Sequence, residues 1–248
     1  YNITKETEEK IKKEVKKVIE NMDIIGLVNV QIAYVNDTVY LLEVNPRASR
    51  TIPFVSKALG MPLAKIAARV MAGISLNEQK ILEVPKLKFF NVKEAVMPFE
   101  KFQNVDPILG PEMRSTGEVM GIGKTFEEAF EKAEIAAGVS IPESGSAFIS
   151  VRNTDKQFLK EIAEDLTQSG FTLVGTKGTV RTLKELGFES KQINKVLEGR
   201  PHIIDLMKNN EISLVINTTE GRESIKDSAS IRRTALEEKI CCTTTIQG

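Results

Sequence analysis

Three oxygen-bearing side chains near the start of the chain have the types and spacing of a divalent-metal site. Glu43 and Asn45 lie two residues apart in an apolar stretch typical of a strand, so both side chains face the same side. Gln31 lies twelve residues before Glu43, on the strand expected to pair with this one. One carboxylate with two amide oxygens suits Mg²⁺ or Mn²⁺. Arg47 follows at once and could hold a phosphate or carboxylate through its bidentate fork.

The pairing of the two strands decides whether these side chains meet. The pattern predicts strands over 27–34 and 39–45, joined around Asn36-Asp37. Gln31 faces Glu43 only if the connecting loop has an odd number of residues, because a slip by one residue turns a side chain to the other face. The metal hypothesis therefore predicts that the hairpin does not have a two-residue turn. The alternative is an ordinary solvent-exposed polar sheet face.

A second set of residues has the pattern of an anion site. The segment 174–179 (V-G-T-K-G-T) ends one expected strand and opens a helix, where backbone N–H groups and hydroxyls can face an anion. The segment 216–219 (I-N-T-T) ends another strand, and ligands of open α/β sheets bind beyond such ends. Lys156 and Lys195 could add positive charge. The alternative is plain N-capping by threonine.

The elements that must position both sets follow from periodicity and from glycine, proline and capping residues. Helices are predicted over 4–21, over 53–73 with Gly73 as the stop, and over 126–137 after the Thr125 cap with Glu128 as its capping-box partner. The segment 138–146 is the linker candidate. Beyond it strands and helices alternate, which predicts a parallel sheet covered by helices. The expected elements are strands 147–151, 171–175, 214–217 and 241–244, and helices 155–169, 179–186 and 231–238.

Composition excludes several classes of protein. The chain has 248 residues, of which 41% are hydrophobic, with 34 basic against 34 acidic residues. This balance excludes a fully disordered chain and argues against a strongly cationic nucleic-acid binder. An apolar run long enough for a transmembrane helix is absent from the sequence, so we expect no membrane partner. The two cysteines are adjacent and poorly placed to pair with each other, which favours a reducing, cytoplasmic setting, and the single histidine, His202, is expected to be structural.

The longer motifs resemble known families. The strings L-L-E-V-N-P-R-A-S-R at 41–50, P-F-V-S-K-A-L-G at 53–60 and D-P-I-L-G-P-E-M-R-S-T-G-E-V-M-G at 106–121 resemble the C-terminal end of an ATP-grasp domain, and most closely that of the carbamoyl phosphate synthetase large subunits. The order S-V-R, G-T-K-G-T, N-K-V-L-E-G-R-P-H and I-N-T-T resembles the methylglyoxal-synthase-like domain. The resemblance implies an α/β fold in two parts. Residues 1–138 would be the C-terminal part of an ATP-grasp domain, an antiparallel sheet plus helices, and residues 139–248 a doubly wound parallel-sheet allosteric domain truncated at its C-terminus.

The resemblance also implies roles for single residues. Gln31, Glu43 and Asn45 would bind two Mg²⁺ or Mn²⁺ ions; Gln31 and Glu43 would also line the ATP site, and Arg47 would face the transferred phosphate or the substrate. Glu94 matches a position that contacts an ornithine effector in some members, the alternative being a surface glutamate. The positions that would hold the phosphate and ribose of UMP or IMP are Ser150, Lys156, Thr176, Gly178, Thr179, Lys195, Asn217 and Thr219.

The implied activity is that of an ATP-dependent ligase. It would phosphorylate carbamate, formed from bicarbonate, to carbamoyl phosphate for pyrimidine and arginine biosynthesis, and would hydrolyse glutamine when paired with a glutamine amidotransferase small subunit. A homo-oligomer is compatible with this reading. The nucleotide-binding lysines and the phosphate-covering loop of the family lie before Tyr1, so we expect the chain alone to be inactive. The alternative is an isolated nucleotide-binding regulatory module without catalysis.

Overall fold

The computed structural model describes residues 3–99, 107, 115–220, 225, 228–246 and 248. Residues 106 and 108–114 of the motif at 106–121 therefore lie outside the described residues. The chain divides into two compact units, residues 1–91 and 92–248. The expected family boundary at residue 138 falls inside the second unit and stays a prediction, because compactness and family domains are different criteria. Among the described residues, no helix combines the length and apolar character that crossing a bilayer requires.

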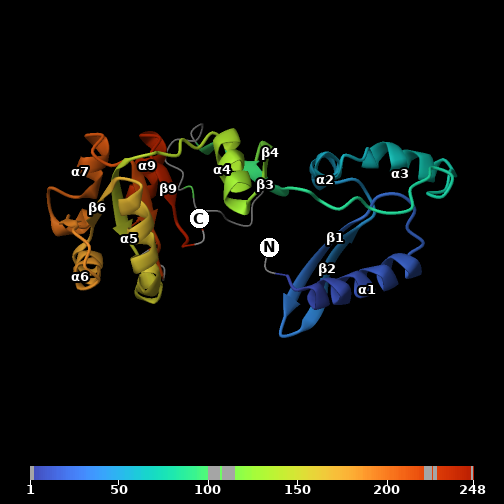
Figure 1. Cartoon of the computed structure of the whole chain (residues 1–248), viewed down its shortest axis with the longest axis horizontal. Helices are drawn as coiled ribbons and strands as arrows, with labels where there is room; N and C mark the ends of the chain where they lie inside the picture. The colour runs from blue at the N-terminus through green and yellow to red at the C-terminus, as the bar shows by residue number, and fades with distance from the viewer. Residues whose placement is uncertain (1–2, 100–106, 108–114, 221–224, 226–227, 247) are drawn as a thin grey trace. The chain divides into compact units, whose positions relative to one another are not determined.

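The first unit contains three helices and one antiparallel hairpin (Figure 1). The amphipathic helix begins at Thr4 as predicted, since the Thr4 hydroxyl accepts a hydrogen bond from the Thr7 N–H at 3.2 Å. The prediction of a single helix over 53–73 is wrong. Gly60 adopts φ +67° and Pro62 follows it, so the chain forms two helices instead of one. The elements are α1 (Lys5–Asn21), β1 (Asn29–Val35), β2 (Thr38–Asn45), α2 (Thr51–Leu59) and α3 (Leu63–Met71).

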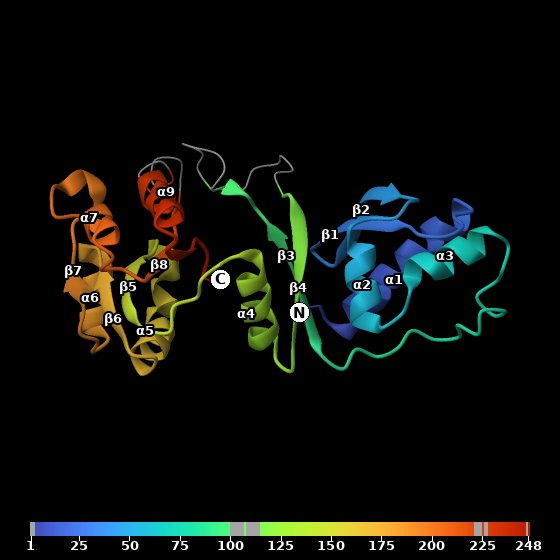
Figure 2. The ribbon, with the colours of Figure 1, turned by 90° about the horizontal axis from the view of Figure 1, so that it is seen from above.

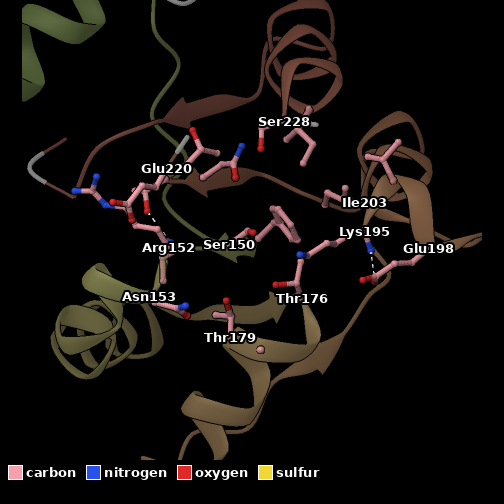
Figure 3. A pocket seen from close by; sticks show the side chains of 18 of the residues that line it. Ser150, Arg152, Asn153, Thr176, Thr179, Lys195, Glu198, Ile203, Glu220 and Ser228 are labelled. Carbon is pink, nitrogen blue, oxygen red and sulfur yellow. Dashed lines mark hydrogen bonds between the residues drawn. The ribbon is translucent and has the colours of Figure 1, made fainter. Parts of the chain in front are cut away.

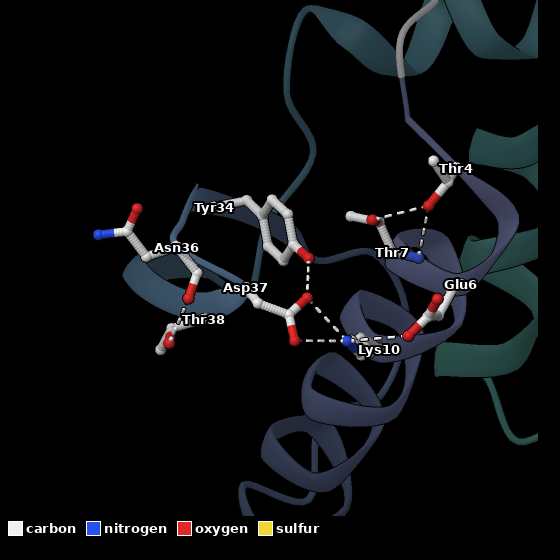
Figure 4. Close-up of polar contacts among 8 residues, drawn as sticks. All are labelled: Thr4, Glu6, Thr7, Lys10, Tyr34, Asn36, Asp37 and Thr38. Carbon is white, nitrogen blue, oxygen red and sulfur yellow. Dashed lines mark hydrogen bonds and ion pairs between the residues drawn. The ribbon is translucent and has the colours of Figure 1, made fainter.

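An ion pair ties helix α1 to the turn of the hairpin (Figure 4). Lys10 Nζ lies 2.7 Å from both carboxylate oxygens of Asp37 and 3.1 Å from Glu6. The Tyr34 hydroxyl donates to the same Asp37 carboxylate. The hydrogen bonds from Lys10 and Tyr34 lower the pKa of Asp37, so this carboxylate stays ionised at neutral pH.

Apolar side chains of the first unit remain largely in contact with solvent. Among the described residues of 1–91, Ala67 alone is buried. Tyr40, Leu41 and Leu42 of strand β2 are 52%, 44% and 65% exposed. By itself, this unit does not close a hydrophobic core.

The second unit starts with a two-stranded sheet and a helix that packs on it. Strand β3 (Phe90–Val96) pairs with β4 (Gly117–Gly123), and sequence periodicity did not predict either strand. Helix α4 (Phe126–Ala137) has the predicted bounds and the predicted cap, since the Thr125 hydroxyl accepts from the Glu128 N–H at 3.2 Å. No helix or strand lies between α4 and strand β5, which begins at Gly145, inside the segment 138–146 expected as a linker.

Two glycines of β4, Gly121 and Gly123, allow α4 to approach the strand closely. A Cβ added to Gly121 would overlap the carbonyl oxygen of Ala129 and crowd the amide of Ala133. Both alanines are fully buried. Glycine facing alanine therefore brings backbone against backbone at this junction.

The rest of the second unit is built on a five-stranded sheet with all neighbouring pairs parallel, as predicted. The order along the sheet is β7-β6-β5-β8-β9. The first of these strands in the chain, β5, is central, and the order reverses between β5 and β8. Ligands of doubly wound sheets bind at such a switch point, beyond the carboxyl ends of the strands. The bounds are β5 (Gly145–Ser150), β6 (Phe171–Gly175), β7 (Lys191–Gln192), β8 (Leu214–Asn217) and β9 (Cys241–Thr243).

Helices cover both faces of this sheet (Figure 2). Phe148 and Ile149 are adjacent on β5, point to opposite faces and belong to two different core clusters. Phe148 packs with residues of α7 and α9, whereas Ile149 packs with residues of α5 and α6. The expected helix 155–169 is a 3₁₀ turn followed by an α-helix, and α7 was not predicted. The elements are η2 (Asn153–Phe158), α5 (Leu159–Gln168), α6 (Lys177–Glu185), η3 (Val196–Glu198), α7 (Ile203–Lys208) and α9 (Ala229–Glu237).

Candidate functional site

The hairpin of the first unit brings the three candidate metal ligands to one face. Gln31 pairs directly with Glu43, and Asn29 pairs with Asn45. The prediction of an odd-length loop is nevertheless wrong, because Val35 pairs with Thr38 and only two residues lie between them. Both turn residues have positive φ, which is the turn type that matches the twist of a hairpin.

A β-bulge reconciles the two-residue turn with the pairing of Gln31 and Glu43. Ile32 pairs with Leu41, and the next pair is Gln31 with Glu43, so Leu42 is an extra residue without a partner. The bulge shifts the register by one residue between the turn and the polar face. Sequence reasoning attributed this shift to the loop, but it lies in the strand.

The donor set fits a hard divalent cation. Asn45 Nδ2 donates to Glu43 Oε1, so the two side chains touch, and both Gln31 and Glu43 are exposed. Asn29 lies on the same face and was not predicted, although its spacing of two from Gln31 signals it. The guanidinium of Arg47 donates a hydrogen bond to the Ala48 carbonyl at 3.0 Å. In the part of the chain that the structure describes, no cluster of three His, Cys, Asp or Glu competes as a metal centre.

The second unit has a pocket of about 560 Å³ at the switch point of its parallel sheet (Figure 3). All eight residues predicted for the nucleotide line it, namely Ser150, Lys156, Thr176, Gly178, Thr179, Lys195, Asn217 and Thr219. The pocket thus gathers the carboxyl ends of β5, β6 and β8 with the first turn of α6. Only the tertiary fold could bring segments so far apart in sequence to one cavity.

The first turn of α6 has the features of an anion site. Thr176 is the N-cap residue, is 7% exposed, and makes no side-chain cap bond. Lys156 Nζ lies 3.7 Å from the position that a Cβ on Gly178 would occupy, so its charge sits over this turn. Amide donors, a hydroxyl and an ammonium group together favour a phosphate.

Asn217 adds a buried donor without a partner among the described residues. The residue is 2% exposed and lines the pocket, and its Nδ2 has no hydrogen-bond acceptor in the part of the chain that the structure describes. A buried amide without an acceptor is costly, so a ligand oxygen in the pocket would satisfy it.

The opposite wall and the rim of the pocket carry further charge. The Lys195 N–H donates to Glu198 Oε2 at 2.9 Å, which fixes the η3 turn that carries Lys195. Six polar lining residues were not predicted, although five of them lie within three residues of the predicted Ser150, Lys195 or Asn217. They are Arg152, Asn153, Glu198, Thr218, Glu220 and Ser228.

Glu94 and His202 lie elsewhere in the second unit. Burial, together with the charge of Glu94 on β3, raises the pKa of Glu134 on α4. His202 is 9% exposed and caps helix α7, where its backbone N–H donates to Asp205 Oδ2 at 2.9 Å. This hydrogen bond lowers the pKa of Asp205, which agrees with the structural role expected for His202.

Comparison with known proteins identifies both parts of the chain. Residues 1–79 match the family described as carbamoyl-phosphate synthase L chain, ATP binding domain, and residues 159–244 match the MGS-like domain. Over all of its 248 residues the chain is 54% identical to the carbamoyl phosphate synthase large chain of Pseudomonas aeruginosa. The chain belongs to the carbamoyl phosphate synthase large-chain family. The large chains of Xanthomonas axonopodis pv. citri and Vibrio parahaemolyticus are 53% and 51% identical over the whole chain.

Membership of the large-chain family confirms the resemblance and the two-part α/β fold. The hairpin with Gln31 and Glu43 lies within the ATP-binding match, and most of the pocket lies within the MGS-like match. The chain spans 23% of the length of these three relatives.

Proposed function

We propose that the chain is part of a carbamoyl phosphate synthase in which Gln31, Glu43 and Asn45 bind two Mg²⁺ or Mn²⁺ ions together with ATP. The observation that carries this proposal is the bulged register, which puts a carboxylate and two amide side chains on one exposed face. The ions would supply positive charge to the β- and γ-phosphates during transfer to carbamate. Neutral amide ligands leave this charge largely uncompensated, as binding of a polyphosphate requires.

The residues around this face have separate tasks. Glu43 can bridge two ions because its two oxygens are independent acceptors. Gln31 and Asn45 orient it, since one pairs with it across the strands and the other donates to it. Arg47 would give up the Ala48 carbonyl and turn to the transferred phosphate.

The pocket of the second unit is proposed to bind a nucleoside monophosphate such as UMP or IMP. Lys156 over the first turn of α6 would hold the phosphate, and Asn217 Nδ2 would donate to a phosphate or ribose oxygen. Lys195, which also lines the pocket, would contribute the second cation. Glu94, beside the carboxyl group of Glu134, would take part in a site for a cationic effector such as ornithine.

The wider activity is proposed from the family. It comprises glutamine hydrolysis by an amidotransferase small subunit, use of bicarbonate, supply of pyrimidine and arginine biosynthesis, and a cytoplasmic location. The exposed apolar residues of β2 and the nearly coreless first unit favour a second candidate for the isolated chain, a nucleotide-binding module without catalysis.

Paired measurements on the full-length large chain and on the 248-residue chain test the proposal. The full-length Glu43→Gln protein should lose carbamate phosphorylation and still bind UMP. The 248-residue chain should bind UMP without binding Mg-ATP. Normal carbamate phosphorylation by Glu43→Gln would refute the metal assignment, and absence of UMP and IMP binding in both forms would refute the pocket assignment.

A further inference from the structure

A buried carboxylate next to the pocket is held by residues from two strand ends. Asp155 is 5% exposed and accepts a hydrogen bond from Arg152 Nε at 2.8 Å and others from the hydroxyls of Thr218 and of its neighbour Thr154. The Thr218 hydroxyl in turn accepts from the Arg152 backbone N–H at 3.1 Å. Three residues thus form a closed ring, in which the one hydroxyl proton of Thr218 points to Asp155.

This ring joins the two strands between which the sheet order reverses. Arg152 follows β5, and Thr218 follows β8. The Thr218 N–H donates to the Ser150 carbonyl at 3.0 Å and extends the pairing of these strands by one bond. Asp155 lies in the η2 turn, directly before Lys156. The ring therefore connects the turn that carries Lys156 to the strand end that carries Asn217 and Thr219.

The chemistry of Asp155 indicates a specific role for the ring. Burial raises the pKa of a carboxyl group, but the hydrogen bonds from Thr218 and Arg152 outweigh burial and lower the pKa of Asp155. Asp155 does not line the pocket, whereas Arg152, Lys156 and Thr218 do. The carboxylate charge of Asp155 therefore interacts with Arg152 and Thr218 in the wall of the pocket, and it does not face a ligand.

We propose that Asp155 is a positioning residue for the nucleotide pocket, which acts through Thr218 and Arg152 to hold Lys156 over the first turn of α6. This proposal rests on the proposed binding function of the pocket. A six-residue 3₁₀ turn has weak hydrogen bonds of its own and needs an outside contact to keep one conformation. Without the ring, ligand binding would have to order the turn and its lysine, and affinity would fall.

Substitutions of Thr218 in the full-length large chain test the ring while preserving side-chain shape. Thr218→Val removes the hydroxyl and should weaken UMP binding, measured by calorimetric titration, by roughly 10-fold. Thr218→Ser keeps the hydroxyl and should bind within about twofold of wild type, since it can still accept from Arg152 and donate to Asp155. Asp155→Asn should behave as Thr218→Val; if it does not fold, Thr218→Val carries the test.

A double-mutant cycle separates positioning of Lys156 from general damage. In a Lys156→Ala background, Thr218→Val should cost less than about twofold in UMP affinity, because the group that it positions is gone. Equal losses in both backgrounds, or wild-type affinity of Thr218→Val, would overturn the positioning role while wild type still binds UMP. If Lys156→Ala binds UMP as well as wild type, Lys156 is not the group that the ring positions, and the positioning role is overturned. If wild type binds neither UMP nor IMP, the pocket function itself is wrong.

Discussion

Gln31 and Glu43 face each other across the β1–β2 hairpin because Leu42, next to Glu43, is a bulged residue without a partner. A regular ladder from the two-residue turn would have paired Gln31 with Leu42 and put Glu43 on the other face. The extra residue shifts the alternation of side chains along β2 by one position, so Glu43 lies on the face of Gln31. Asn45, two residues after Glu43, lies on the same face. The proposed metal site thus depends on a local irregularity of one strand.

Two single-residue deletions in β2 should have opposite effects on metal binding. Deletion of Leu42 removes the bulge and leaves Gln31 opposite Glu43 in a regular ladder, so Mn²⁺ affinity of the full-length enzyme should stay within a few-fold. Deletion of Val44 turns Asn45 to the other face and should weaken Mn²⁺ binding roughly 10-fold or more. Electron paramagnetic resonance titration measures both affinities. Equal losses in the two variants would show that the bulge does not set the face.

Glu43→Gln should abolish carbamate phosphorylation with little change in fold, since the amide keeps the shape and removes the negative charge that binds metal. The transfer of radiolabelled phosphate from ATP to carbamate measures this phosphorylation step. Glu8→Gln, on the exposed surface of α1, is the matched control and should keep full activity. Activity of Glu43→Gln near that of the control would rule out Glu43 as a ligand.

Lys195→Ala should weaken UMP or IMP binding roughly 10-fold, because it removes a charge-assisted hydrogen bond to the nucleotide. Lys160→Ala is a suitable control, since Lys160 is 65% exposed and pairs with Glu164 outside the pocket. Titration calorimetry on full-length protein gives both affinities. An unchanged affinity of Lys195→Ala would remove Lys195 from the binding site.

Gly121→Val should destabilise the second unit by about 2 kcal/mol or more, because its side chain would push α4 from β4. Gly117→Ala on the same strand is the control, as nothing lies within 4 Å of its added Cβ. Urea unfolding followed by circular dichroism compares the two. Equal stability of the variants would mean that α4 does not depend on this close approach.

Stability should fall at alkaline pH through Cys242. Burial raises the pKa of this thiol to about 12, above the ordinary value of roughly 8.5, so the folded state holds the proton more tightly than the unfolded state. The contribution of the protonated Cys242 thiol to the free energy of unfolding is complete below about pH 8.5 and is lost as pH rises towards 12. The difference in unfolding free energy between wild type and Cys242→Ala should therefore narrow from pH 7 to pH 10. A constant difference would contradict the raised pKa.

Local patterns predicted much of the fold in the second unit. Helix 126–137 and strands 171–175 and 214–217 have the predicted bounds, because capping residues and short apolar runs act within a few residues. The two-residue strand β7 and the short helix α7 escaped prediction, since neither is long enough to show a period. Strand β4 escaped for a different reason. Its glycines are poor strand formers, and packing against α4 stabilises it.

The sequence by itself determined which residues are candidates for the chemistry, because the amide, carboxylate, lysine and threonine side chains and their motifs are local properties. Their assembly was decided by tertiary structure. Eight residues spread over 150–219 line one pocket only because β5 and β8, separated by two strands in the chain, are neighbours in the sheet. Likewise, the bulge at Leu42 shows no sign in the apolar pattern, since Leu41 and Leu42 are chemically identical. Pairing between the strands inserts one extra residue before Glu43, and the presence of that residue determines the face on which Glu43 lies.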